Sequence, residues 1–217
     1  MLFGKFSFGN HSRRKRWMAV LSLSFVLLLL IPVSLSEEEK DTGWDTATIS
    51  TESDLNDVIA LNSTSAIAVG DSGKLYFTED SGANWSESDS GVVQDLNSIE
   101  FNEQAIAVGD SGTVIVSDGD SWTDNSIEEA GNLYDLSVPH FESLSNSTIF
   151  VSGTGGEIWK WSNNSWSDLS NGTGTDENIY AIDFIDNDKG FAVGANGLII
   201  ATSDGGLSWE VRALSSS

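Results

Sequence analysis

The chain has 217 residues, no cysteine and a formal net charge of −23, because 33 acidic residues stand against ten lysines and arginines. The lack of cysteine excludes disulfides, thiolate metal sites and cysteine nucleophiles. The acidic balance argues against DNA and RNA as partners, since the positive surface that neutralises phosphates is missing.

The first 36 residues have the pattern of a targeting segment and are set apart from the fold. Residues 13–16 are all basic, residues 17–31 are almost wholly apolar, and Pro32 ends the apolar run. Basic residues beside such a run stay on the cytoplasmic side of a membrane. We therefore expect everything from Glu37 onward to be extracytoplasmic.

Two fates of this segment fit the sequence equally well. Ser34 and Ser36 are the small residues that a signal peptidase recognises, which predicts cleavage before Glu37 and a secreted protein. Alternatively, residues 17–35 approach the roughly 20 residues that span a bilayer, which predicts an uncleaved anchor. In either interpretation, the membrane is contacted only through residues 17–36.

The part after the leader is strongly acidic. Five of the ten basic residues lie in the leader, and the remainder has five basic residues against 33 acidic ones, a net charge of −28. This charge fits a site for cations or a basic partner, or simply a well-solvated surface, and we favour the solvated surface. Residues 37–53 form an acidic linker in which residues 44–49 resemble a stray strand.

An internal repeat organises the rest of the chain. The octapeptide at residues 66–73 recurs unchanged at 105–112, and looser copies occur at 150–156 and 191–197. A tryptophan follows each copy: Trp85, Trp122, Trp166 and Trp209. The period of 37 to 44 residues is the length of one four-stranded propeller blade. The repeats have the following approximate bounds: 54–94, 95–132, 133–177 and 178–217.

Strand signals recur in the same order within each repeat. The first strands begin near four positions: Asp54, Asp95, Leu133 and Ile179. Tyr180, Ile182 and Phe184 alternate with polar or small residues, which predicts a first strand with one buried face. The second strand, such as residues 66–69, is continuously apolar, and the Gly-Asp-Ser-Gly that follows predicts a tight hairpin into the third strand. A more polar fourth strand ends each repeat.

We therefore predict an all-β fold, a β-propeller of about four four-stranded blades, preceded by an N-terminal hydrophobic helix. One blade cannot bury both faces of its sheet, so neighbouring blades must stack. Four repeats could make a minimal closed ring, an open array, or half of a ring that a second chain completes as a homodimer. The sequence leaves these three arrangements open.

Two segments match the pattern of an Asp box, Ser/Thr-x-Asp-x-Gly-x-x-Trp. They lie at residues 78–85 and 202–209, in register with the repeat. The matching residues are Thr78, Asp80, Gly82 and Trp85 in the first box, and Thr202, Asp204, Gly206 and Trp209 in the second. The corresponding segments of the middle repeats, 117–122 and 161–166, keep the tryptophan without the full box.

These boxes, together with residues 188–209, resemble the repeat of the photosystem II stability and assembly factor propellers and their non-photosynthetic relatives, over roughly residues 54–217. The resemblance implies that the box is a folding device. Its Asp accepts hydrogen bonds from turn N–H groups, its Gly supplies an unusual backbone angle, and its Trp packs between blades.

The same resemblance implies a protein partner and a role in assembling a membrane or envelope complex. The photosynthetic role is not carried over, because the family's factor uses a basic patch and this chain is acidic. We accordingly expect a non-enzymatic interaction module. The alternatives are a glycoside hydrolase of the Asp-box propeller type and a passive structural protein of the envelope.

No catalytic constellation emerges from the residues. A sialidase uses several arginines to bind its substrate's carboxylate, and the part after the leader contains only Arg212. Other glycosidases need two carboxylates, but no pair here is distinguished by its context. His140 is the only histidine after the leader, and no serine is marked as its nucleophilic partner.

Two further kinds of site are weaker expectations. Asp118 and Asp120 are candidate calcium ligands, since Asp-Gly-Asp turns offer oxygen atoms, although no EF-hand spacing is present. No other cofactor is expected. Five Asn-x-Ser/Thr sequons are candidate glycosylation sites, namely Asn62, Asn84, Asn146, Asn163 and Asn171.

Overall fold

The computed structural model describes residues 49, 51–140 and 147–212, with the backbone alone for His140. The chain divides into two units, Met1–Thr46 and Ala47–Ser217, and every described residue belongs to the second. The expected leader and its hydrophobic helix lie outside the described residues. So does the expected stray strand, apart from Ile49, which is not in a strand. A membrane-spanning helix is not found among the described residues.

Sixteen strands in the described residues form four antiparallel sheets of four consecutive strands each. The first sheet contains β1 (Leu55–Ala60), β2 (Ala66–Gly70), β3 (Leu75–Thr78) and β4 (Ser86–Ser88). The second contains β5 (Leu96–Asn102), β6 (Gln104–Gly109), β7 (Val114–Ser117) and β8 (Trp122–Asp124). The third contains β9 (Leu133–His140), β10 (Thr148–Gly153), β11 (Ile158–Ser162) and β12 (Ser165–Asp168). The fourth contains β13 (Ile179–Phe184), β14 (Gly190–Gly194), β15 (Ile199–Thr202) and β16 (Glu210–Val211).

A short 3-10 turn joins the second and third strands of every sheet. These turns are η1 (Asp71–Gly73), η2 (Asp110–Gly112), η3 (Thr154–Gly156) and η5 (Ala195–Gly197), and a further turn, η4 (Ser170–Gly172), follows β12. In η1, Ser72 and Gly73 have φ angles of 58° and 69°. A Cβ on Gly73 would lie 2.2 Å from the carbonyl oxygen of Val92, so only glycine fits there.

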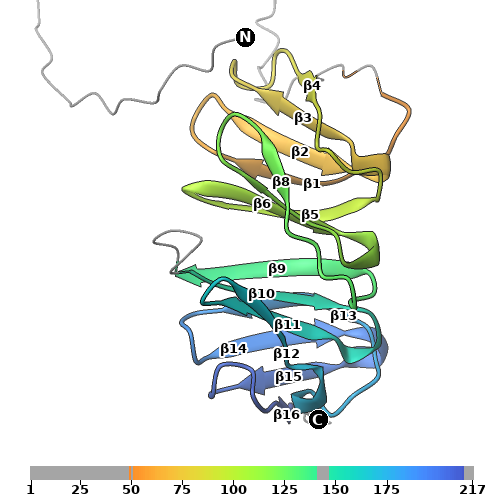
Figure 1. Ribbon diagram of the computed structural model, residues 1–217, viewed down its shortest axis with the longest axis vertical. Coiled ribbons are helices and arrows are strands. Elements are labelled where there is room, and N and C mark those ends of the chain that lie inside the picture. The colour runs from red at the N-terminus through yellow and green to blue at the C-terminus, as the bar shows by residue number, and fades with distance from the viewer. Residues whose placement is uncertain (1–48, 50, 141–146, 213–217) are drawn as a thin grey trace, which may run out of the picture. The chain divides into compact units, whose positions relative to one another are not determined.

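The sheets follow one another in chain order and pack mainly through their first strands, β1, β5, β9 and β13, which we call the inner strands. Figure 1 shows the sheets one above the other, from β1–β4 to β13–β16. In the described part of this unit, extensive packing joins only sheets that are consecutive in sequence. The four blades therefore form an open series, since no comparable packing joins the first sheet to the last.

Three apolar clusters fill the spaces between successive blades. The first junction buries Ile67, Val69, Leu75, Leu96, Ile99, Ala105, Ala107 and Ile115. The second buries Ile106, Val108, Val114, Val116, Ile127, Ala130, Leu133, Leu136, Ile149, Val151 and Trp159. The third buries Phe150, Ile158, Ile179, Ile182, Phe184, Ala192, Ile200 and Trp209.

Strand β6 shows why the second strands are continuously apolar. Ala105 and Ala107 belong to the first junction, whereas Ile106 and Val108 belong to the second. Successive side chains of a strand point to opposite faces, so a strand between two blades buries every residue. The prediction of an all-β fold with four four-stranded blades is confirmed.

The prediction for the first strand of the last repeat is wrong in one respect. Ile182 and Phe184 are buried as expected, but Tyr180 is 52% exposed and Ile179 is buried in its place. The cause is a β-bulge between Ile179 and Ala181, which shifts the pairing of β13 with β14 by one residue. The bulge turns Tyr180 away from the junction.

Candidate functional site

The first Asp box is a closed hydrogen-bond network within one turn. The Thr78 hydroxyl donates to Asp80 Oδ1 at 2.9 Å and accepts the N–H of Gly82 at 3.1 Å. Asn84 donates its backbone N–H to Asp80 Oδ1 at 2.8 Å and its amide N–H to Oδ2 at 2.7 Å. These bonds from Asn84 lower the pKa of the Asp80 carboxyl.

The second box has the same network with different residues. Thr202 donates to Asp204 Oδ1 at 2.8 Å, and the N–H of Gly206 donates to the Thr202 hydroxyl at 3.1 Å. Ser208 replaces Asn84 and donates its hydroxyl and backbone N–H to Asp204 at 2.6 Å and 2.9 Å. The bonds from Ser208 lower the pKa of Asp204 to about 2. Both box carboxylates are therefore ionised, and they accept hydrogen bonds from residues of their own turns.

The tryptophans of the two boxes differ in burial. Trp209 is 8% exposed and meets the Phe184 ring edge to face, with the ring centroids 5.8 Å apart. Trp122 and Trp166 are partly buried against the first and second junctions. Each of these three tryptophans thus packs toward the blade that precedes its own. Trp85 lies in the first described blade and is only half-buried.

The calcium candidates lie in the hairpin between β7 and β8. The Asp118 carboxylate accepts the backbone N–H groups of Asp120 and Ser121 at 3.0 Å and 2.8 Å. The bond from Ser121 is the largest cause of the lowered pKa of Asp118. Among the described residues, no three His, Cys, Asp or Glu side chains gather as metal ligands would. Asp118 thus stabilises the hairpin by accepting its backbone N–H groups, and Asp120 is exposed beside it.

The remaining sequence candidates lie on turns and strand ends. Four sequon asparagines are exposed, namely Asn62, Asn84, Asn163 and Asn171, and Asn146 lies outside the described residues. The side-chain nitrogen of Asn84, where a glycan would be attached, donates to Asp80. His140 ends β9 opposite Thr148, and Arg212 pairs with Glu210 at 3.0 Å. The structure does not bring the described ones together into one site.

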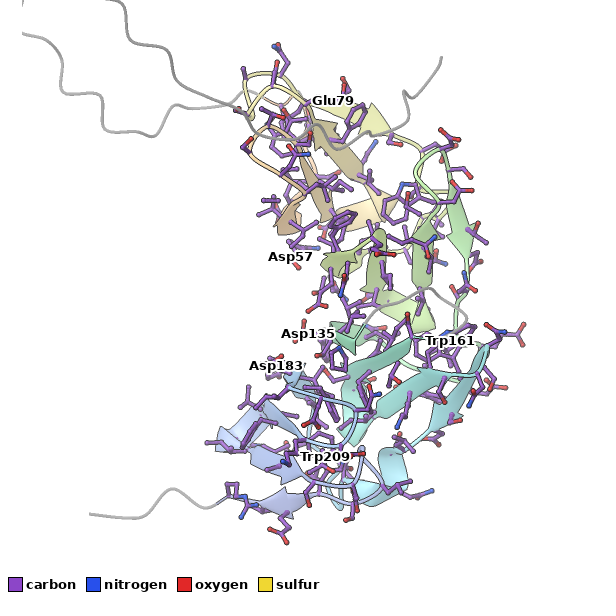
Figure 2. All side chains as sticks on the ribbon, turned by 90° about the vertical axis from the view of Figure 1, so that its left-hand side faces the viewer. Asp57, Glu79, Asp135, Trp161, Asp183 and Trp209 are labelled. Atoms are coloured by element: carbon purple, nitrogen blue, oxygen red, sulfur yellow. The ribbon has the colours of Figure 1, made fainter. Side chains whose placement is uncertain are left out.

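The inner strands hold a group of carboxylates that the sequence did not single out. These carboxylates, which we call the inner carboxylates, belong to Asp57, Glu100, Asp135 and Asp183. Figure 2 shows Asp57, Asp135 and Asp183 along one edge of the unit, with Trp161 toward the opposite edge. One such residue comes from each of β1, β5, β9 and β13, so the inner edge of every blade carries a carboxyl group.

Three of the inner carboxylates bind the backbone of the next blade. Asp57 accepts the N–H of Ile99 at 2.9 Å, Glu100 accepts that of Val138 at 3.1 Å, and Asp135 accepts that of Ile182 at 2.8 Å. Each bond crosses a blade junction and satisfies a strand-edge donor.

The Ser98 hydroxyl lies 3.0 Å from Asp57 and 3.1 Å from Asp135, but it can donate its single proton to only one of them at a time. Glu100 is close enough to the other inner carboxylates for their charges to act on it. Burial first, and then repulsion from Asp135, Asp183 and Asp57, raise the pKa of Glu100 to about 7. Burial likewise raises the pKa of Asp135. The inner edge therefore gathers carboxyl groups that repel one another when ionised, and Glu100 is only partly ionised near pH 7.

The cations in the described residues lie elsewhere. Lys74 pairs with Glu87, and Arg212 pairs with Glu210. Lys160 stands over the Phe150 ring at 5.0 Å, and the charge of Lys189, beside β14, acts on Asp186. Neither ion pair includes an inner carboxylate. A signal for this surface was present in the sequence, because Asp57 and Asp135 occupy the same position of their repeats. The signal was missed because a polar residue at this position also fits the apolar–polar alternation of an ordinary first strand.

Comparison with known families points to one group of propellers. The family model described as photosynthesis system II assembly factor YCF48 matches residues 158–217. A relative from Prochlorococcus marinus, the photosystem II assembly lipoprotein Ycf48, is 43% identical over 53 residues. The match covers 24% of this chain and 15% of the relative.

Solved structures give a longer likeness at lower identity. YCF48 from Cyanidioschyzon merolae has a TM-score of 0.57 at 18% identity, over 78% of this chain and 60% of that one. YCF48 bound to D1 peptide has a TM-score of 0.54 at 15% identity, over 75% and 54%. An ancestral GH74 enzyme has a TM-score of 0.56 at 15% identity, over 75% of this chain and 24% of the enzyme.

This chain spans little more than half the length of the two YCF48 structures and a small part of the curated relative. At such identities the structural likeness concerns the fold alone. The repeat itself is also matched in sequence, by the family model and by the Prochlorococcus relative. The resemblance to the assembly-factor group of Asp-box propellers is thus confirmed.

Proposed function

We propose that this chain is a non-enzymatic interaction propeller that binds a cationic segment of another protein along its inner strands and so assists the assembly of a membrane or envelope complex. The observation that carries the proposal is the row of inner carboxylates, one on each inner strand, without a neutralising cation in the described residues. A lysine or arginine of a partner would supply the missing charge.

The inner edge also offers contact beyond charge. Tyr134 and Tyr180 lie with ring centroids 5.4 Å apart, and Tyr180 is 52% exposed. The two tyrosines belong to the inner strands β9 and β13, and an exposed aromatic face there suits the methylene stem and the cationic head of an arginine or lysine. The two middle inner strands, β5 and β9, pack against inner strands on both sides, which restrains this part of the surface. A rigid surface loses little conformational entropy when a flexible segment binds.

The family likeness supports a polypeptide as the ligand. One of the similar structures is a YCF48 bound to D1 peptide, and the curated relative is named an assembly lipoprotein. The charge of the inner edge argues for a different, basic segment in the case of this chain. The 217 residues contain no cysteine that could carry a lipid. We propose instead that residues 17–36 direct the protein across the membrane or hold it there.

The glycosidase alternative has less support. Asp57 and Asp135 each accept a backbone N–H of the next blade, so both are committed to holding blades together. Glu100 has the raised pKa of a general acid, but its carboxylate also accepts the N–H of Val138. The likeness to the GH74 enzyme covers only 24% of that enzyme.

Fluorescence polarisation with a labelled extended peptide of alternating lysine and threonine tests the proposal. We expect saturable binding that weakens with salt, and none to the same peptide with glutamate in place of lysine. Asp183→Asn removes an exposed inner carboxylate and should weaken binding about fivefold, the equivalent of about 1 kcal/mol for a partly exposed ion pair. Asp120→Asn removes an exposed carboxylate on the β7–β8 hairpin and serves as the matched control.

The pH dependence gives a second readout. Glu100, with a pKa of about 7, gains negative charge as the pH rises from 6 to 8, while the peptide's lysines stay protonated. The affinity should therefore increase over this range, and Glu100→Gln should abolish the increase. Equal loss of binding in Asp183→Asn and Asp120→Asn would show only general charge attraction and would refute a site on the inner edge.

A further inference from the structure

The four blades present equivalent surfaces to the blade that follows. Ile67, Ile106 and Phe150 occupy one repeat position, and each is buried in the junction with the next blade. In the last blade this position is Phe191, which is 52% exposed, and two residues further Val193 is 44% exposed. The last described blade thus displays an apolar face that is covered in every earlier blade.

The first blade displays the opposite face. In the later blades, two inner-strand positions are buried against the preceding blade: Leu96 and Ile99, Leu133 and Leu136, and Ile179 and Ile182. The residues at these positions in the first blade are Leu55 and Val58, which are 39% and 59% exposed. Tyr76, on β3, belongs to the same face and is buried. The exposed part of this face is therefore the part that β1 forms.

A polar contact accompanies every internal junction. The turn amide of Ser72 donates to Asp95 of the next blade at 2.8 Å, Ser111 donates to Asn132 at 3.1 Å, and Gly155 donates to Asn178 at 3.0 Å. Each donor sits at the positive-φ position of its 3-10 turn. Each acceptor directly precedes the inner strand of the following blade.

The last blade carries the donor of one more such contact, and the first blade carries the acceptor. Asn196, with φ of 55°, holds the donor position in the last blade, and Asp54 holds the acceptor position before β1. The Asp54 carbonyl accepts the N–H of Asp71 at 3.0 Å, which places Asp54 as Asp95 is placed in the next blade. Within the described ranges, neither the Asn196 N–H nor the Asp54 carboxylate has a partner of this kind.

We propose that a second copy of this chain docks its first blade on the last blade of the first copy, and that the reciprocal contact closes an eight-bladed ring with twofold symmetry. The new junction repeats the internal ones: Phe191 and Val193 cover Leu55 and Val58, and the Asn196 N–H donates to Asp54. Eight blades lie within the usual range for propellers, and two equal junctions close the assembly without leaving an apolar face.

A second copy suits these faces better than an unrelated protein would. The two exposed faces belong to one chain and carry the two halves of the same apolar and polar pattern. The high negative charge opposes association, but the junction is apolar and keeps the inner carboxylates at its edge, as the internal junctions do. The inference is independent of the proposed binding of a cationic segment.

Cysteine crosslinking of the full chain in its membrane or secreted form tests the proposal, because the native sequence has no cysteine to confuse the result. Val58→Cys and Val193→Cys are combined in one chain and treated with a short bismaleimide. The positions aligned with them, Ile99 and Val69, lie in the same internal junction. We expect one dimer band that contains most of the protein, and also a dimer when the two single variants are mixed.

Three results would overturn the proposal. No crosslink in the double variant would mean that the end faces do not meet. A dimer from Val193→Cys alone would mean that the last blades pack face to face. A ladder of higher species would mean an open filament rather than a closed ring. Asp120→Cys combined with Val193→Cys is the control, since Asp120 is on the hairpin at the far end of its blade's third strand and should not crosslink.

Discussion

The Asp boxes of the first and last blades have nearly the same sequence and the same hydrogen bonds, yet their tryptophans are in different environments. In both turns the threonine hydroxyl accepts two backbone N–H groups and the aspartate carboxylate accepts a third. Trp209 is buried against the third junction, whereas Trp85 is half-buried. The hydrogen bonds of the box are thus local to its turn, whereas the contribution of its tryptophan to stability depends on the blade that precedes it.

The largest effect is expected for Trp209→Ala. Removing a large buried aromatic side chain from a packed junction costs about 3 to 5 kcal/mol, as the lost contacts with Phe184 and its neighbours leave a cavity. Denaturant unfolding followed by circular dichroism measures the loss. A change below the expected range would mean that the third junction closes around the missing ring.

Trp85→Ala should cost less. The ring is only half-buried, so about 1 to 2 kcal/mol is expected for the same substitution. The comparison uses one protein, one motif and one residue type, which makes each variant the other's control. Equal losses in the two variants would mean that the tryptophan acts within its own turn, contrary to the difference in burial. A second chain docked on the first blade would also raise the loss for Trp85, in a concentration-dependent way.

Asp80→Ala and Asp204→Ala should lower the melting temperature by similar, smaller amounts. Each removes an exposed carboxylate that holds one turn together through the same set of bonds. Differential scanning calorimetry of the two variants measures the shifts. Clearly unequal shifts would show that the junctions, and not the turns alone, determine the contribution of the box.

The smallest effect is expected in the pH dependence. The folded pKa of Asp204 is about 2, below its ordinary value of 3.8, so its contribution to stability is complete above pH 4 and is lost as the pH falls toward 2. The pKa of Asp80 is lowered as well, so the first box should follow the same direction. Asp204→Ala should flatten the acid limb of a plot of melting temperature against pH. An unchanged limb would contradict the role of the ionised carboxylate.

Much of the fold is predictable from the repeat. The second strand expected at 66–69 corresponds to β2, and the first strand expected near Asp54 begins at Leu55. The register of β13 was not predictable, because a β-bulge leaves no mark in an alternating pattern and exposes Tyr180. The inner carboxylates were missed for a related reason. In the sequence each is an ordinary polar residue of a strand. Their grouping appears only when the four blades place the inner strands side by side.

The number of repeats and the order of strands within each repeat follow from the sequence, because strand and turn patterns recur along the chain. The two Asp boxes are also visible there, because each is formed by residues within eight positions of one another. The burial of each tryptophan, the exposed faces of the two end blades and the grouping of the inner carboxylates follow only from the packing of the blades. Those properties depend on the neighbouring blade, about 40 residues away along the chain, and the same motif therefore has different surroundings in different blades.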